Sequence, residues 1–171
     1  NPTVFTADIE FAGQVVKLNV TDPVITAGVS IKKTGYAQTM NNNIMRWTVS
    51  GVRNDSTTSL QSFYWRDTLP TDAVRLTRLV TGTYSTTQTY KVTFTTNLNS
   101  QWRTAYDNLS TAKNYTLDMS SAALGLASNE YVTQFMLSFG IVPAGFHQLT
   151  NATVDAQTLY ALTNGYKFTN K

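Results

Sequence analysis

Residues 60–69 read Leu-Gln-Ser-Phe-Tyr-Trp-Arg-Asp-Thr-Leu, and from Phe63 onward the apolar side chains fall on every second position. Successive side chains of a β-strand point to opposite faces, so this period of two predicts a strand with one buried face. Asp67 continues the alternation of Phe63 and Trp65, and we therefore expect its carboxyl group to point inward with them. The turn residues Leu69-Pro70-Thr71-Asp72 follow directly and predict the end of the strand.

The same period of two recurs on both sides of this segment. Thr occurs 29 times in the 171 residues, and Thr, Val, Tyr and Phe all fit a pleated, half-buried surface. Turn residues such as Asn41-Asn42-Asn43 and Pro143-Ala144-Gly145 separate the alternating runs. Short, frequent strands of this kind predict an all-β, antiparallel sandwich. The predicted strands cover residues 3–11, 14–20, 29–33, 44–52, 60–69, 74–84, 88–96, 115–119, 131–139 and 166–169.

Two segments depart from this rhythm and predict one or two short helical insertions. Residues 99–109 begin on a possible capping Asn or Ser, and a helix there would place Trp102, Ala105, Tyr106 and Leu109 on one face. Residues 120–124 predict a shorter turn. We expect both to be connections packed over the end or edge of a sheet.

One domain boundary is expected, near Pro23 to Gly28. It divides an N-terminal hairpin or linker strand region, residues 1–27, from a main module, residues 28–171. Two interpretations of the first region stay open. The hairpin adds an edge to the main sheet, or it belongs with a neighbouring module.

The composition excludes several classes of function. The chain has no Cys, which excludes a disulfide framework, a zinc finger and a thiol nucleophile, and its single His makes a His-based metal site or a conventional triad hard to build. The formal net charge is only +3 and the basic residues are scattered, so we expect no nucleic-acid partner. No calcium-loop spacing, phosphate-binding glycine loop or glycosidase acid pair is present, and we expect no cofactor, no metal and no enzymatic activity on a substrate. No apolar run approaches the ~20 residues that cross a bilayer, so we expect no membrane insertion of this segment.

The candidate reactive residues are Lys33, Asp67 and Asn170. If Val29 and Ile31 face the core, Lys33 shares their face by the same period of two. Burial disfavours the ammonium form and lowers the pKa of a lysine, whereas it raises the pKa of a carboxyl group such as that of Asp67. Asn170 would share the inward face of the final predicted strand.

A neutral amine, a protonated acid and a carboxamide in one dry pocket are the ingredients of a self-made isopeptide bond. The Lys33 amine attacks the Asn170 side-chain carbonyl, Asp67 polarises that carbonyl and transfers protons, and ammonia leaves. This is a single-turnover reaction of the protein on itself. Three alternatives stay open: Lys33 snorkels to the sheet edge, Asp67 caps the turn that follows it, and Asn170 is a frayed terminus.

Three motifs, in this order, resemble a known family: Val29-Ser30-Ile31-Lys32-Lys33-Thr34-Gly35, Met45-Arg46-Trp47-Thr48-Val49 and Trp65-Arg66-Asp67-Thr68-Leu69-Pro70. Over roughly residues 28–171 the chain resembles the Ig-like modules of Gram-positive surface adhesins and pilins, of the collagen-adhesin A-type or a related conserved-repeat type. The resemblance implies an Ig-like β-sandwich in which Lys33 matches the cross-linking lysine, Asp67 the assisting acid and Asn170 the terminal asparagine. The chain departs from the family pattern near Trp102, and the terminal match is brief.

The resemblance also implies a function. We expect a structural stalk or scaffold module of a bacterial adhesin or pilus-like protein, outside the cell at a Gram-positive cell wall. Its expected partners are adjacent modules of a larger surface protein, and a host matrix protein or glycan. The alternative is a carbohydrate- or host-protein-binding β-sandwich with an exposed aromatic platform. Most of the aromatic candidates fall within alternating strands and are expected in the core; they are Tyr36, Trp47, Tyr64, Tyr84, Tyr90, Trp102 and Tyr106.

Overall fold

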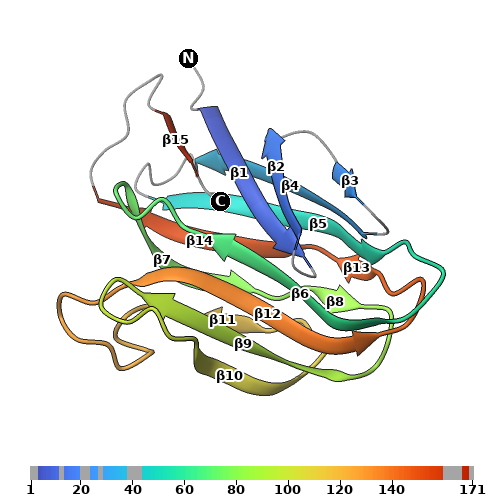
Figure 1. Cartoon of the computed structure of the whole chain (residues 1–171). Coiled ribbons are helices and arrows are strands. Elements are labelled where there is room, and N and C mark those ends of the chain that lie inside the picture. Colours follow the sequence, from blue (N-terminus) through green and yellow to red (C-terminus); the bar gives the residue numbers. More distant parts are fainter. Residues whose placement is uncertain are drawn as a thin grey trace.

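The computed structural model describes the backbone of residues 4–11, 14–19, 24–26, 29–37, 44–159 and 167–169, and the side chains of residues 44–159. Every regular element in these ranges is a β-strand (Figure 1). The strands are β1 (Val4–Phe11), β2 (Gln14–Asn19), β3 (Val24–Thr26), β4 (Val29–Ala37), β5 (Ile44–Asn54), β6 (Leu60–Thr68), β7 (Val74–Val80), β8 (Thr83–Tyr84), β9 (Thr89–Thr96), β10 (Arg103–Ser110), β11 (Thr116–Asp118), β12 (Val132–Val142), β13 (Gln148–Thr150), β14 (Ala152–Thr158) and β15 (Lys167–Thr169).

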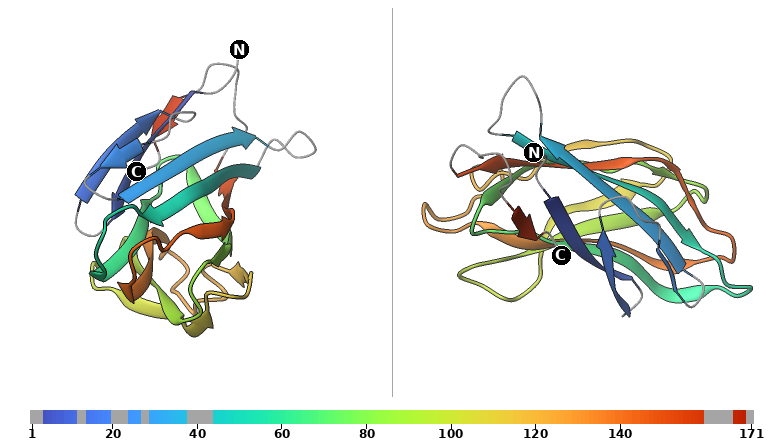
Figure 2. Two further views of the ribbon diagram at one scale, coloured as in Figure 1. Left: turned by 90° about the vertical axis from the view of Figure 1, so that its right-hand side faces the viewer. Right: turned by 90° about the horizontal axis from the view of Figure 1, so that it is seen from above.

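Two large sheets pack against one core (Figures 1 and 2). The first has the order β10-β9-β12-β6-β1-β15, with β2 also paired to β1, and the second has the order β11-β7-β14-β5-β4-β3. β8 and β13 form a separate small pair. The β1–β15 pair is parallel and the other pairings in the described ranges are antiparallel. The predicted all-β, antiparallel architecture is confirmed, and its two layers are those of a β-sandwich.

Alternating burial along the central strands produces the core. Trp47 and Val49 of β5 are buried, while the residues between them and beside them are half-buried. Phe63 and Trp65 of β6 follow the same pattern, so the predicted period of two is confirmed in both strands. Aromatic rings fill much of the space between the sheets; Tyr84 and Phe139, for example, lie 4.8 Å apart between ring centroids.

The predicted helix over residues 99–109 is wrong. Residues 103–110 form β10, an edge strand, and the described part of the chain contains no helix, so the predicted helical insertions are wrong as well. The register between β10 and β9 shifts twice, on either side of Tyr106, and Asn108 adopts a φ of 53°. Bulges of this kind displace side chains from strict alternation. The displaced apolar positions then imitate the spacing of a helical face.

The shorter predicted turn is present. Residues 121–125 form a turn in which the Leu124 amide donates to the Ser120 carbonyl at 3.1 Å. This turn belongs to the connection between β11 and β12 and remains a single turn rather than a helix.

Besides β10, three further strands were not predicted from the sequence: β3 and β14 of the second sheet, and β13 of the small pair with β8. β14 pairs with both β5 and β7 and so lies inside the second sheet. Its inward residues include Ala152 and Ala156, which give a weak hydrophobic signal, and a register shift follows Asp155. A small-residue strand with a bulge has no clear period of two.

The N-terminal segment forms the predicted hairpin, in which β1 and β2 pair antiparallel. β1 also pairs with β6, which attaches the hairpin to the first sheet, while β3 pairs with β4 in the second sheet.

Asn54, the last residue of β5, joins two turns at one end of the molecule. Its side-chain amide donates to the carbonyls of Thr58 and Pro143, both at 3.0 Å, and its side-chain oxygen accepts from the amide and hydroxyl of Ser56. Its backbone amide also donates to the Phe146 carbonyl at 2.7 Å. Asn54 is fully buried, and these hydrogen bonds give its side-chain amide the partners that a polar group needs inside a protein.

Candidate functional site

Asp67 lies in the apolar interior, as the alternation predicted. It is 1% exposed and follows the buried Phe63 and Trp65 along β6. Its Cα partner across the ladder to β12 is Phe135, which is also fully buried and packs edge-on against Trp65 with ring centroids 5.8 Å apart.

Lys33 occupies a position on β4 opposite a core residue of β5. The register pairs Lys33 with Val49, which is fully buried, and pairs Lys32 with Ser50, which is half-buried. Residues directly opposite each other on antiparallel strands share a face of the sheet. The register therefore assigns Lys33 to the inward face and Lys32 to the outward face. The side chains of β4 lie outside the described residues.

The end of β15 and Asp67 lie along the same side of β1. Thr6 pairs with β2 and with Thr169 of β15, whereas Ile9 pairs with β2 and with Asp67 of β6. Each strand residue has neighbours on two sides only, so β2 occupies one side of β1 while β15 and β6 share the other. β15 runs parallel to β1 and β6 runs antiparallel to it, so these two strands point toward each other. Asn170, the residue after Thr169, lies outside the described residues.

β1 is the common neighbour of the three strands that carry, or lead to, the predicted residues. β6 and β15 flank it within its own sheet. β4 belongs to the opposite sheet, and some of its Cα atoms approach those of β1 within 8 Å. Asp67 and the end of β15 are thus brought to the same side of β1, and β4, the strand that carries Lys33, approaches β1 from the opposite sheet.

A row of charged residues, which the sequence pattern did not predict, crosses the outer face of the second sheet. Arg46 of β5, Asp155 of β14 and Arg78 of β7 are directly opposite one another in the register, and Asp118 of β11 stands opposite Arg78. Arg46 Nε donates to Asp155 Oδ1 at 2.6 Å, and Arg78 Nη2 donates to Asp155 Oδ2 at 2.6 Å. Burial alone would raise the pKa of Asp155, but hydrogen bonds from the two guanidinium groups lower it below its ordinary value.

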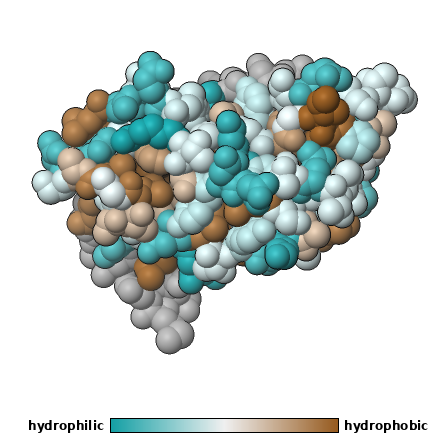
Figure 3. Space-filling model, turned by 90° about the horizontal axis from the view of Figure 1, so that it is seen from below, coloured by the Kyte–Doolittle hydropathy of each residue, from teal (hydrophilic) through white to brown (hydrophobic). Residues whose placement is uncertain are grey.

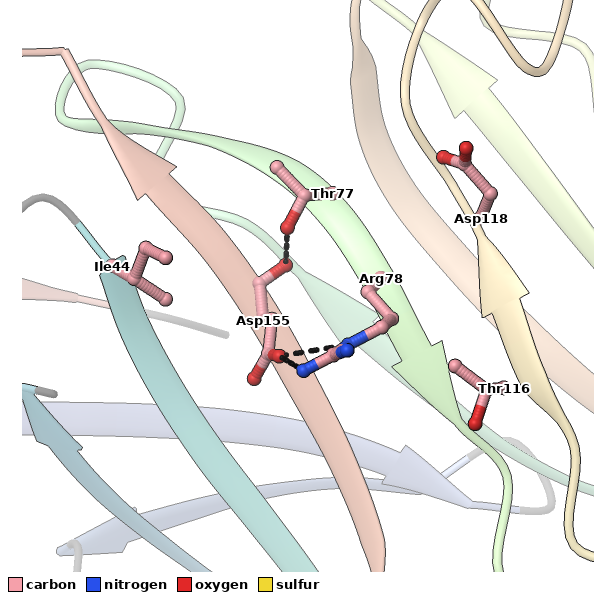
Figure 4. Close-up of a pocket in the computed structure, with 6 residues that line it drawn as sticks. All are labelled: Ile44, Thr77, Arg78, Thr116, Asp118 and Asp155. Atoms are coloured by element: carbon pink, nitrogen blue, oxygen red, sulfur yellow. Dashed lines mark hydrogen bonds and ion pairs between the residues drawn. The ribbon is translucent and has the colours of Figure 1, made fainter. Parts of the chain in front are cut away.

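A hollow of about 430 Å³ lies beside this row (Figure 4). Thr77 donates a hydrogen bond to the Asp155 carbonyl within it, and Asp118 accepts one from the Ser120 amide, which lowers the pKa of Asp118. The four charged side chains of the row balance one another, so we assign it a stabilising role across four strands. The lining residues are Ile44, Thr77, Arg78, Thr116, Asp118 and Asp155.

Two buried tyrosines place hydroxyl groups inside the core. Tyr84 accepts a hydrogen bond from the Trp65 indole and donates one to the Thr81 carbonyl. Burial raises the pKa of Tyr84 above its ordinary value, despite the bond from Trp65, and raises the pKa of Tyr90 to about 12. Both groups are therefore neutral in the folded protein at neutral pH.

We expect these tyrosines to make the fold sensitive to alkali. An unfolded tyrosine ionises near pH 10, so their contribution is complete below about pH 10 and is lost as the pH rises toward and beyond about 12. Urea unfolding followed at about pH 8 and in steps above pH 10 should show a falling midpoint that coincides with phenolate absorbance. A Tyr90→Phe variant should show a shallower fall. An equal fall in this variant would contradict the assignment to Tyr90.

Three of the seven aromatic candidates are core residues, as expected for side chains within alternating strands. Trp47, Tyr84 and Tyr90 are buried, and Tyr64 and Tyr106 are half-buried. Tyr36 lies in the part of the chain whose side chains are not described. Trp102 is exposed, in the loop between β9 and β10 that also carries the exposed Leu98. On the face shown in Figure 3, apolar residues form small groups separated by hydrophilic surface rather than one large patch.

In residues 44–159, no group of three or more His, Cys, Asp and Glu side chains is placed to hold a metal ion. No helix in the described ranges is long and apolar enough to span a membrane. Comparison with known proteins gives no match to a family model, to a curated protein or to a solved structure.

Proposed function

We propose that the chain is an extracellular structural module with an Ig-like β-sandwich, stabilised by an isopeptide bond between Lys33 and Asn170. Such a module serves as a stalk or scaffold in a bacterial cell-surface adhesin or pilus-like protein. The observation that carries the proposal is Asp67, an acid buried in an apolar row on the strand that shares one side of β1 with β15.

The chemistry follows from the environment of Asp67. In this proposal Asp67 acts in its protonated form and donates to the Asn170 side-chain carbonyl. The neutral amine of Lys33 attacks the carbonyl carbon, so a carbon–nitrogen bond to Lys33 forms and the bond to the original amide nitrogen breaks. A proton moves from the attacking amine, through Asp67, to the leaving nitrogen, which departs as ammonia. Atoms and charge balance, and no oxidant is needed.

A bond at these positions suits a protein that transmits force. It would join strand β4 to Asn170, the residue that follows β15. Most of the main module would then lie inside one covalent loop. The chain has no Cys, so a disulfide cannot supply this restraint, and an amide bond is not broken by reductants. The antiparallel two-sheet architecture and the resemblance of residues 29–70 to adhesin modules support the same function.

The intact mass of the purified protein tests the proposal directly. We expect the mass to fall short of the sequence mass by one ammonia, and proteolytic fragments to contain Lys33 joined to Asn170. Lys33→Ala, Asn170→Ala and Asp67→Ala should each have the full mass of their own sequences. Lys32→Ala is the matched control, because the register assigns Lys32 to the other face, and it should keep the deficit.

A full intact mass in the unmodified chain would overturn the cross-link. A deficit that survives Lys33→Ala, or fragments that join Lys32 or Asn164 instead, would show that the assignment of faces is wrong.

A further inference from the structure

The loop between β9 and β10 exposes two large apolar side chains. Leu98 is 57% exposed and Trp102 is 38% exposed. The chain has three tryptophans, and the other two, Trp47 and Trp65, are buried. Exposed tryptophan is uncommon on a surface without a partner, because the indole has a large apolar area and is enriched at binding sites.

Hydrogen bonds hold this loop in one conformation. The Asn97 side chain donates to the Asn129 carbonyl at 3.0 Å and accepts from the Tyr131 amide at 2.8 Å, which ties the loop to the connection between β11 and β12. Within the loop, the Gln101 amide donates to the Asn99 side chain at 2.9 Å. A loop fixed by such bonds presents its exposed residues without a further ordering cost on binding.

Glu130 anchors the base of the loop. It accepts hydrogen bonds from the Thr96 hydroxyl and from Arg103 Nη2, both at 2.6 Å. The Arg103–Glu130 ion pair thus satisfies its own charges. Residues 97–102 and 127–129 contain no charged side chain, and their polar groups are amides and hydroxyls.

We propose that Trp102 and the amide-rich residues around it form a binding site for a neutral oligosaccharide. The face of a sugar ring presents C–H groups that pack on the electron-rich face of an indole. Sugar hydroxyls both donate and accept hydrogen bonds, as do the side-chain amides of Asn99, Gln101 and Asn129. A charged ligand would find the adjacent charges, Arg103 and Glu130, already paired with each other, and a purely apolar ligand would leave the amides without partners.

This site is separate from the cross-link and goes beyond the stalk function. It places a recognition surface on a loop of the rigid module, and it does not depend on Lys33, Asp67 or Asn170. The mass experiment and the binding experiment can therefore fail independently.

Tryptophan fluorescence supplies the test, because Trp47 and Trp65 are buried and Trp102 is the indole that acrylamide reaches most readily. We would titrate the full chain with neutral oligosaccharides of hexoses and of N-acetylhexosamines, with an acidic oligosaccharide and with an uncharged oligopeptide. We expect a blue shift, and protection from acrylamide quenching, with at least one neutral oligosaccharide at millimolar concentration. Calorimetry on Trp102→Ala should then show affinity reduced at least about tenfold, and Trp102→Phe should retain part of it.

Leu149→Ala, which alters an exposed leucine outside this loop, is the matched control and should bind like the unmodified chain, whereas Leu98→Ala should bind more weakly. Circular dichroism and the urea midpoint would establish that each variant is folded. The proposal is overturned if no neutral oligosaccharide changes the Trp102 signal, if binding survives Trp102→Ala, or if only the acidic sugar or the oligopeptide binds in a Trp102-dependent way.

Discussion

A Lys33→Met chain should unfold with a free energy about 4–5 kcal/mol lower than that of the unmodified protein. The substitution keeps an apolar stem of similar length and removes the nitrogen that would form the cross-link. Lys33 and Asn170 are 137 positions apart, so the proposed bond would restrain a long loop in the unfolded chain. Losing that restraint makes the unfolded chain more expanded, and the urea m-value should rise as the midpoint falls.

The rise in m-value separates a lost cross-link from a merely damaged core, which would lower the midpoint at unchanged m. Lys32→Met should leave both quantities unchanged. Either change alone removes the same bond, so adding the second change should cause no further loss. The double variant Lys33→Met/Asn170→Ala should therefore be as stable as the less stable of the two single variants. Additive losses in this cycle would mean that the two residues stabilise the fold separately.

An Asn54→Ala chain should lose about 3–4 kcal/mol of unfolding free energy. Four side-chain hydrogen bonds of a fully buried residue disappear. The Thr58 and Pro143 carbonyls each keep one partner, the Ser56 hydroxyl and the Phe146 amide, whereas the Ser56 amide loses its bond to the Asn54 side chain. Each such loss costs about 1 kcal/mol or more inside a protein. The damage reaches the core, because Phe146, bonded to the Asn54 backbone, packs against Phe63 with ring centroids 5.4 Å apart.

Urea unfolding measures this loss, and Asn151→Ala provides the control. Asn151 is exposed, and its substitution should change stability by less than about 0.5 kcal/mol. Asn54→Asp keeps the acceptor oxygen for Ser56 but loses both donations, so it should also destabilise, and more strongly above the carboxyl pKa, where a charge is buried. A loss in Asn54→Ala no larger than in Asn151→Ala would contradict the role assigned to the buried amide.

The alternation of apolar and polar residues was the most reliable signal in the sequence. It predicted strands correctly where one face of the strand is buried and the other is more exposed. Residues 44–52 and 60–69 alternate because one face meets the opposite sheet and the other does not, and both predicted strands are present. The same reasoning placed Asp67 inward correctly, since only its position in the alternation matters. It failed for β10, where two register shifts and a left-handed Asn108 replaced the period of two with a helix-like spacing.

The charged row on the second sheet could not be predicted from local pattern. Asp155 finds Arg46 and Arg78 at separations of 109 and 77 residues, on strands that are neighbours only after the sheet has formed. The strand that carries Asp155 was itself unpredicted, because its inward residues are small. Long-range pairing of this kind depends on topology, and no short segment contains it.

The parallel pairing of β1 and β15 has a mechanical consequence. A force that enters at the start of β1 and leaves at the end of β15 pulls two parallel neighbours in opposite directions along their length. The hydrogen bonds from Val4–Lys167 to Thr6–Thr169 then share the load at the same moment, instead of opening one after another as in a hairpin peeled from its ends. Rupture in this shear geometry requires several bonds to fail together, so a three-residue strand can resist more force than its length suggests.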